Sequence, residues 1–254
     1  MTVEIDQEVF GMEVAISEDP LFWNSIIYPE SKRKVFTMNL EPYGVEKHPS
    51  PQGVPVHQLL NKDILLPIIK QYGNYLNTSS LPVAGSLFLK RYAVLVAASS
   101  LDYYGLQKKR IDWWSTARLD VTSFKLLIEE NPTELFDDCW KNRIFAQNLT
   151  PMITIISEEC KISSKILWEN LAVRLLATLR KNEELYTLNE LNKHFNDLTS
   201  AEANWLGMEQ NPFQTYIQIK DTWIEAPVRK TCCRYYEVNT KSDIPYCKKC
   251  PLRK

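Results

Sequence analysis

The feature that most constrains this chain is a helical spacing of apolar residues that begins near His57 and continues through most of the chain beyond it. The clearest example places seven apolar side chains on one helix face: Leu167, Trp168, Leu171, Ala172, Leu175, Leu176 and Leu179. Apolar residues at intervals of three and four predict amphipathic helices that pack around a shared core. A chain of 254 residues is long enough to bury such a core.

Three shorter signals refine this helical pattern. Pro67 falls inside an apolar run and is expected to kink or divide its helix. Thr150 followed by Pro151 favours the start of another helix. Thr199 and Glu202 have the spacing of a capping box, which predicts a further short helix after them.

Two regions depart from the helical spacing. Residues 111–127 are the best strand candidate in the middle of the chain, and Trp113 and Trp114 within them are expected in the core. Before residue 56, six of the 14 prolines prevent long regular elements, so residues 42–55 are predicted to form an extended loop.

The expected fold class is therefore α+β, with a predominantly helical body, a small sheet and a C-terminal cysteine-rich segment. We expect three parts: a Pro-rich N-terminal segment packed on the body (1–56), the helical body (57–226) and the cysteine-rich segment (227–254).

Composition excludes several kinds of chemistry. The seven glycines form neither a G-x-G-x-x-G turn nor a Walker loop, so backbone-cradled nucleotides are not expected. The three histidines, His48, His57 and His194, share no metal-binding spacing and are interpreted as surface or satisfied side chains. The first ten residues lack a secretory pattern, and the most apolar run, 92–101, is about half of a membrane span. We expect a cytoplasmic protein without stable membrane insertion.

Cysteine spacing is the strongest functional signal. Four of the six cysteines, Cys232, Cys233, Cys247 and Cys250, lie in the last 23 residues as C-C-x13-C-x2-C. In a reducing compartment such a cluster favours a metal site over disulfides. Of the other two, Cys139 is expected in the core and Cys160 is expected to have no part in the site.

The adjacent pair Cys232 and Cys233 bears on which metal is bound. Tetrahedral zinc ligands lie only about 3.8 Å apart, whereas neighbouring side chains on an extended backbone point to opposite faces. A 2Fe-2S cluster has thiolates at both ends and accommodates divergent neighbours more easily. The doublet therefore favours an iron–sulfur cluster over a single zinc ion.

The doublet, a spacer and a final C-x2-C-P-L resemble the C-terminus of the FhuF-like ferric-siderophore reductases, whose cluster is held by C-C-x10-C-x2-C. Arg229, Tyr235 and Tyr236 fit the flanks, and weaker similarity covers residues 86–93 and 167–172. The spacer here is three residues longer than in that pattern.

This resemblance implies a 2Fe-2S cluster bound by Cys232, Cys233, Cys247 and Cys250, and one-electron reduction of Fe(III) in imported siderophore complexes. The implied partners are a ferric siderophore and an electron-donor protein, and nucleic acid is not expected. Residues 227–254 carry a net charge of +6 and the remainder −7, so a positive rim would attract an anionic chelate or an acidic donor.

Two other functions stay open. Four thiolates could hold a zinc ion in an interaction module, with no redox chemistry. The helical body could also bind a siderophore or a citrate-like precursor without reducing it.

Overall fold

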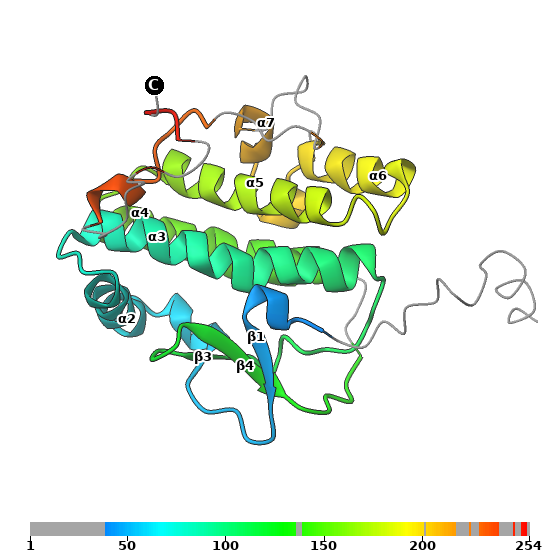
Figure 1. The fold of residues 1–254 in the computed structure, drawn as a ribbon, viewed down its shortest axis with the longest axis horizontal. Helices are drawn as coiled ribbons and strands as arrows, with labels where there is room; N and C mark the ends of the chain where they lie inside the picture. The colour runs from blue at the N-terminus through cyan, green and yellow to red at the C-terminus, as the bar shows by residue number, and fades with distance from the viewer. Residues whose placement is uncertain are drawn as a thin grey trace, which may run out of the picture. The chain divides into compact units, whose positions relative to one another are not determined.

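The computed structural model describes residues 39–135, 139–200, 202–216, 224, 229–238, 246 and 250–252. These residues all belong to one unit that begins at Met38. Within it, helices pack on one another above a small sheet (Figure 1), which is the α+β, mostly helical fold that the sequence predicts.

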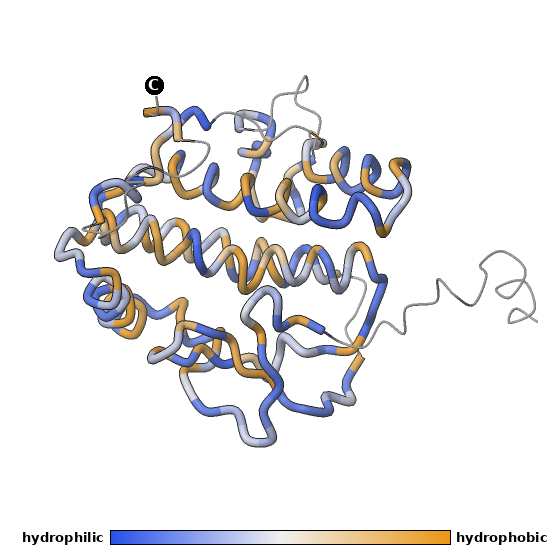
Figure 2. The backbone as a smooth tube through the Cα atoms, viewed as in Figure 1, coloured by the Kyte–Doolittle hydropathy of each residue, from blue (hydrophilic) through white to orange (hydrophobic). Residues whose placement is uncertain are grey.

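The central element is α3 (Leu81–Ala93), which continues through two π-helical segments, Val94–Ala98 and Leu101–Leu106. Pro82 lies in its first turn, where the missing N–H costs no hydrogen bond. Hydrophobic residues recur along the whole helix (Figure 2). Among the described residues, Leu81–Leu106 is the one helix long and apolar enough to cross a membrane, and 72% of its apolar window is buried within the protein. It is the core helix around which the others pack.

The remaining helices surround α3. They are α2 (Lys62–Tyr75), α4 (Thr150–Glu159), α5 (Ser164–Lys181), α6 (Leu188–Thr199) and α7 (Pro212–Tyr216), of which α2, α4 and α5 contact α3 directly. Figure 1 shows α5 running alongside α3. α5 is the stretch with the clearest amphipathic pattern in the sequence, and its apolar face is buried.

One expected helix division is not seen, and one expected helix start is confirmed. Pro67 lies inside α2, which runs undivided because Leu65, Ile68 and Ile69 bury its apolar face and offset the lost backbone hydrogen bond. The helix α4 begins at Thr150 with Pro151 in its first turn, as expected, and it follows directly on a π-helical segment, Asn142–Leu149.

The capping box is also displaced from its predicted position. Thr199 is the last residue of α6, and its hydroxyl donates to the Phe195 carbonyl in that helix. The capping box of the structure lies at the other end of α6, where Thr187 and Glu190 bond each other's backbone N–H. The sequence contains this T-x-x-E spacing, but the prediction placed the signal at the wrong threonine.

A four-stranded mixed sheet lies on the other side of α3. Its strands are β1 (Val45–His48), β2 (Val54–Pro55), β3 (Arg118–Asp120) and β4 (Lys125–Glu129), in the order β1-β4-β3-β2, with β1 parallel to β4 and the other pairs antiparallel. The strands β3 and β4 bear out the candidate at 111–127. Residues 42–55, expected as extended loop, contribute β1 and β2 to this sheet.

Burial of single residues follows the sequence in part. Trp113 and Trp114 are buried, as predicted. Of the two cysteines outside the tail, Cys139 is exposed. Cys160 is buried against Gly85, between α4 and α3. The prediction for Cys139 was wrong because it lies just before its helix rather than on the buried face.

Candidate metal centre

Three of the four tail cysteines lie in the described residues, and Cys247 lies outside them. Cys232 and Cys233 precede a short 3-10 helix, Tyr235–Glu237, which lies beside the first turns of α3 (Figure 1). Cys233 is buried, with 1% exposure, Cys250 is nearly as buried, and Cys232 is half-buried.

The two sulfur atoms of Cys232 and Cys250 converge. They lie 3.9 Å apart, and the backbone N–H of Arg234 donates to Cys232 Sγ over 3.3 Å. Burial raises the pKa of the Cys232 thiol to about 11; the Arg234 N–H opposes this rise, and the neighbouring Cys250 and Cys233 add to it. Two sulfurs that converge in this way are groups that a bound cation would deprotonate together.

The sulfur of Cys233 has a different neighbour. Lys90, on α3, donates to Cys233 Sγ over 3.4 Å, and one turn earlier on the same helix the Ser86 hydroxyl donates to the Cys233 carbonyl over 3.0 Å. Burial alone would raise the pKa of Cys233, but the positive charges of Lys90 and Arg229 outweigh it and lower that pKa. The adjacent cysteines thus occupy unlike electrostatic settings.

A buried carboxylate fixes the chain just before the doublet. Glu169, on α5, accepts hydrogen bonds from the backbone N–H groups of Lys230 and Thr231, from the Thr231 hydroxyl and from Arg229 Nη2. Glu169 and Arg229 are both almost fully buried. Because each buried charge needs the other, this ion pair ties the cysteine segment to α5.

Asn170 connects the ion pair of Glu169 and Arg229 to α3. Its Nδ2 donates to both the carbonyl and the hydroxyl of Ser86 over 3.1 Å, and its Oδ1 accepts from Arg229 Nη2 over 2.7 Å. The structure therefore brings together the tail and the two body segments 86–93 and 167–172. The sequence pointed to Arg229 as a flank of the cysteine motif but did not place Ser86 or Asn170 at the site.

Arg234, which directly follows the doublet, forms an ion pair with Glu237. Arg234 has a left-handed φ of 61° and makes two 2.7 Å contacts to the Glu237 carboxylate. The rings of Tyr236 and Tyr246 lie 5.8 Å apart. The positive charge of Arg234 is therefore compensated locally.

The described residues contain three of the four proposed ligands. Among the described residues no group of three or more His, Cys, Asp or Glu side chains is arranged to hold a metal ion. What this part of the chain contains is a pair of converging sulfurs, a third buried sulfur beside a cation, and Glu169, which holds their segment in place.

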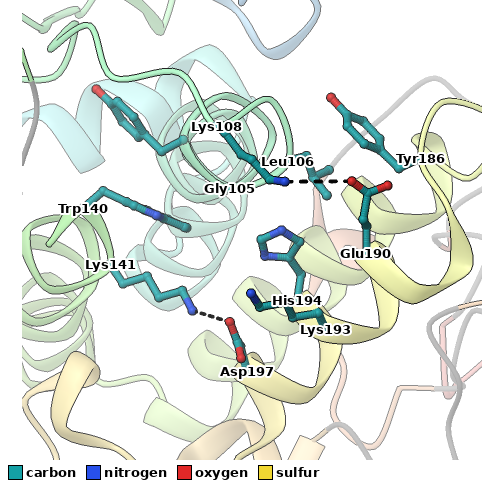
Figure 3. Close-up of a pocket in the computed structure, with 11 residues that line it drawn as sticks. Gly105, Leu106, Lys108, Trp140, Lys141, Tyr186, Glu190, Lys193, His194 and Asp197 are labelled. Carbon is teal, nitrogen blue, oxygen red and sulfur yellow. Dashed lines mark hydrogen bonds and ion pairs between the residues drawn. The ribbon is translucent and has the colours of Figure 1, made fainter. Parts of the chain in front are cut away.

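A separate pocket of about 270 Å³ lies at the opposite end of the long helix, at Tyr104 and Gly105. Gly105 lies about four turns after Lys90 along this helix. Figure 3 shows the His194 ring in this pocket, facing Trp140, with Lys108 pointing toward Glu190.

The polar side chains of this pocket largely satisfy one another. Lys108 lies 4.0 Å from Glu190, and Lys141 lies 2.9 Å from Asp197. His194 is the exception: its Nδ1 is buried and has no hydrogen-bond partner among the described residues. His194 is thus half-buried with one ring nitrogen unsatisfied, rather than a surface or satisfied side chain, because it lies on the face of α6 that turns toward Gly105.

The pocket shares no residue with the cysteine segment, which leaves the doublet and its surroundings as the candidate metal centre. No family model and no curated protein matches the chain.

Proposed function

We propose that this protein is a cytoplasmic oxidoreductase that reduces Fe(III) in siderophore complexes, using a 2Fe-2S cluster bound by Cys232, Cys233, Cys247 and Cys250. The observation that carries the proposal is the doublet: the sulfur of Cys232 lies against Cys250, while that of Cys233 lies against Lys90. Adjacent thiols with separate neighbours suit a cluster with a ligand pair at each end better than one small ion.

The described residues fit such a cluster. The 3.9 Å between the sulfurs of Cys232 and Cys250 is close to the separation of about 3.8 Å expected for two ligands of one tetrahedral metal. Cations beside Cys233 compensate the negative charge that thiolate ligands introduce into a buried place. When bound, a 2Fe-2S cluster supplies reversible one-electron transfer.

The chain's own residues hold this centre and shield it. Glu169 and Asn170 anchor the segment that carries the doublet, and the Ser86 hydroxyl donates to the Cys233 carbonyl. The buried position of Cys233 and Cys250 keeps water from their sulfurs. Cys232 is half-buried, which makes its side of the centre the side that a substrate approaches.

A ferric siderophore is the substrate class that this chemistry suits. Siderophores bind iron through hard oxygen donors, which a triply charged ion attracts more strongly than a doubly charged one. Adding one electron to the iron therefore loosens the complex and lets other ligands remove Fe(II). The electron comes from a donor protein.

The decisive experiment is anaerobic purification followed by visible spectroscopy and metal analysis. We expect a red-brown protein with about two irons and two labile sulfides per chain. Its colour should bleach on reduction and return when a ferric siderophore is added. A colourless protein that contains zinc would refute the proposal.

Matched variants locate the ligands. Cys232→Ser and Cys250→Ser should abolish or alter the visible bands, whereas Cys139→Ser, at an exposed cysteine, should leave them unchanged. Equal loss of colour in all three variants would show that these cysteines are not specific ligands.

The zinc-binding alternative rests on the same pair of sulfurs, since 3.9 Å also suits two ligands of one zinc ion. Metal analysis separates the two. Binding of a ferric siderophore without reoxidation of the reduced protein would instead favour the non-redox siderophore-binding role.

A further inference from the structure

Lys90 stands out among the charged side chains near the doublet. Its ammonium lies 3.4 Å from Cys233 Sγ and 5.5 Å from the centroid of the Tyr235 ring. No carboxylate of the described residues lies within ion-pair distance of it. The other cations nearby are compensated, Arg229 by Glu169 and Arg234 by Glu237.

A half-buried ammonium gains little from a neutral thiol, because a thiol is a weak acceptor. It gains much more from a thiolate, through both a charge-assisted hydrogen bond and Coulomb attraction. Cys233 is 1% exposed and packs among hydrophobic core residues, where an uncompensated negative charge would be costly. The pairing makes physical sense if Cys233 carries negative charge in the functional protein.

The position of Lys90 is fixed from two sides. Ser86 lies one turn before it on α3 and bonds the Cys233 carbonyl, so two groups on one helix face hold the same residue. The Tyr235 ring covers the ammonium on another side. Because Cys233 itself is buried, the attraction between the ammonium and the sulfur is screened less than it would be between two exposed groups.

Reduction adds one negative charge to an iron–sulfur centre. A fixed positive charge beside a ligand sulfur stabilises the reduced state more than the oxidised state, and so raises the reduction potential. The Cys232 side has no equivalent among the described residues, since a backbone N–H meets its sulfur and the nearby Arg234 is paired.

We propose that Lys90 is a positioning residue that sets the reduction potential of the metal centre by donating a charged hydrogen bond to Cys233. The inference rests on the proposed 2Fe-2S function. In each turnover the donor protein loses one electron, the centre gains it and then passes it to Fe(III), which becomes Fe(II). A higher potential eases the first transfer and weakens the driving force of the second, so Lys90 balances the two.

The test compares Lys90→Met, which removes the charge, with Lys90→Arg, which keeps it, and with Lys70→Met, at an exposed lysine on α2. Spectroelectrochemical titration gives the midpoint potential of each protein. We expect Lys90→Met to shift the equilibrium about tenfold toward the oxidised form, a potential about 59 mV more negative for one electron. Lys90→Arg should keep most of the wild-type value, and Lys70→Met all of it.

Rates provide a second readout. Once reduced, Lys90→Met should transfer its electron to a ferric siderophore faster than wild type, yet be reduced more slowly by the same donor. Lys90→Met with full iron content and an unchanged potential would overturn the inference.

If Lys90→Met fails to retain iron, Co(II) added to the apoprotein still reports on the sulfur. Without the ammonium, the thiolate-to-metal charge-transfer band should move to longer wavelength, and an unmoved band would overturn the inference. Absence of iron and sulfide in the wild type would instead refute the proposed function, so the two failures are distinguishable.

Discussion

At the scale of single residues, the candidate centre depends on a few buried polar groups. Glu169 satisfies four donors from the chain before the doublet, and Arg229 supplies the charge that compensates it. An ion pair in such a place adds little net stability compared with apolar residues, but removing one partner leaves a buried charge unpaired. The pair therefore acts chiefly to specify where the cysteine segment attaches.

We predict that Glu169→Gln lowers the free energy of unfolding by about 3–5 kcal/mol, because the buried charge of Arg229 loses the carboxylate that compensates it. The same variant should lose bound metal. Urea denaturation and metal analysis measure both effects. Adding Arg229→Met to Glu169→Gln should recover part of the stability. Glu158→Gln, at an exposed carboxylate, should change it by less than about 0.5 kcal/mol; a Glu169→Gln protein as stable as this control would contradict the prediction.

His194 gives a pH dependence at the same scale. Burial lowers its pKa below the ordinary value of 6.5, and the positive charge of Lys141 adds to the shift, against the opposite effect of Asp197. Lys193 and Lys108 also face it and lower the pKa further. The unfolded chain binds the proton more readily than the folded protein, so stability present above about pH 6.5 is lost as the pH falls through the lowered pKa.

We therefore expect the wild type to lose more thermal stability between pH 7 and pH 5 than His194→Gln, whose side chain does not titrate. Calorimetry across this range measures the difference. Parallel pH profiles for the two proteins would show that His194 is not the titrating group.

At the scale of elements, the boundaries of helices depend on which local signal the packing uses. Thr187 and Thr199 stand at the two ends of α6, and each has an acidic residue three positions later. A capping box needs free N–H groups at a helix start, and Thr187 has them because the preceding residues 182–186 turn away from α5. At Thr199 the backbone is still part of α6, so the same sequence spacing has no cap to form.

We predict that Thr187→Ala lowers the free energy of unfolding by about 1 kcal/mol, since it removes the acceptor for the Glu190 N–H. Thr199→Ala is the matched control at the position that the sequence favoured, and it should cost less than about 0.5 kcal/mol. Chemical denaturation distinguishes the two variants. A larger loss for Thr199→Ala would place the cap where the sequence predicted it.

At the scale of the whole molecule, charge is unevenly distributed along the chain. Residues 227–254 carry +6 and the rest −7, and the positive part contains all four proposed ligands. Charges of this kind act over about 10 Å at 0.1 M salt and about 3 Å at 1 M. They affect how quickly an anionic partner arrives more than how the chain folds.

The rate of reduction of an anionic ferric siderophore should therefore fall as salt is added. Lys248 and Lys249 lie outside the described residues but flank Cys247 and Cys250 in sequence. Replacing both with Gln should lower kcat/KM by up to about tenfold at low salt and have little effect at 1 M. Lys70→Gln with Lys165→Gln, at exposed positions on the body, is the control. A salt-independent rate would exclude steering by the tail.

The sequence by itself determined the helical body, a strand region within residues 111–127 and the set of candidate ligands. Periodicity and cysteine spacing are local properties, and a local pattern is enough to predict an amphipathic helix such as α5. Only the tertiary structure decided what surrounds the doublet. Ser86 and Cys233 are 147 residues apart in the chain, and Lys90 and Cys233 are 143 apart. No spacing rule connects residues at such separations; the packing of α3 beside α5 brings Ser86, Lys90 and Glu169 to one place, because both helices bury their apolar faces against each other.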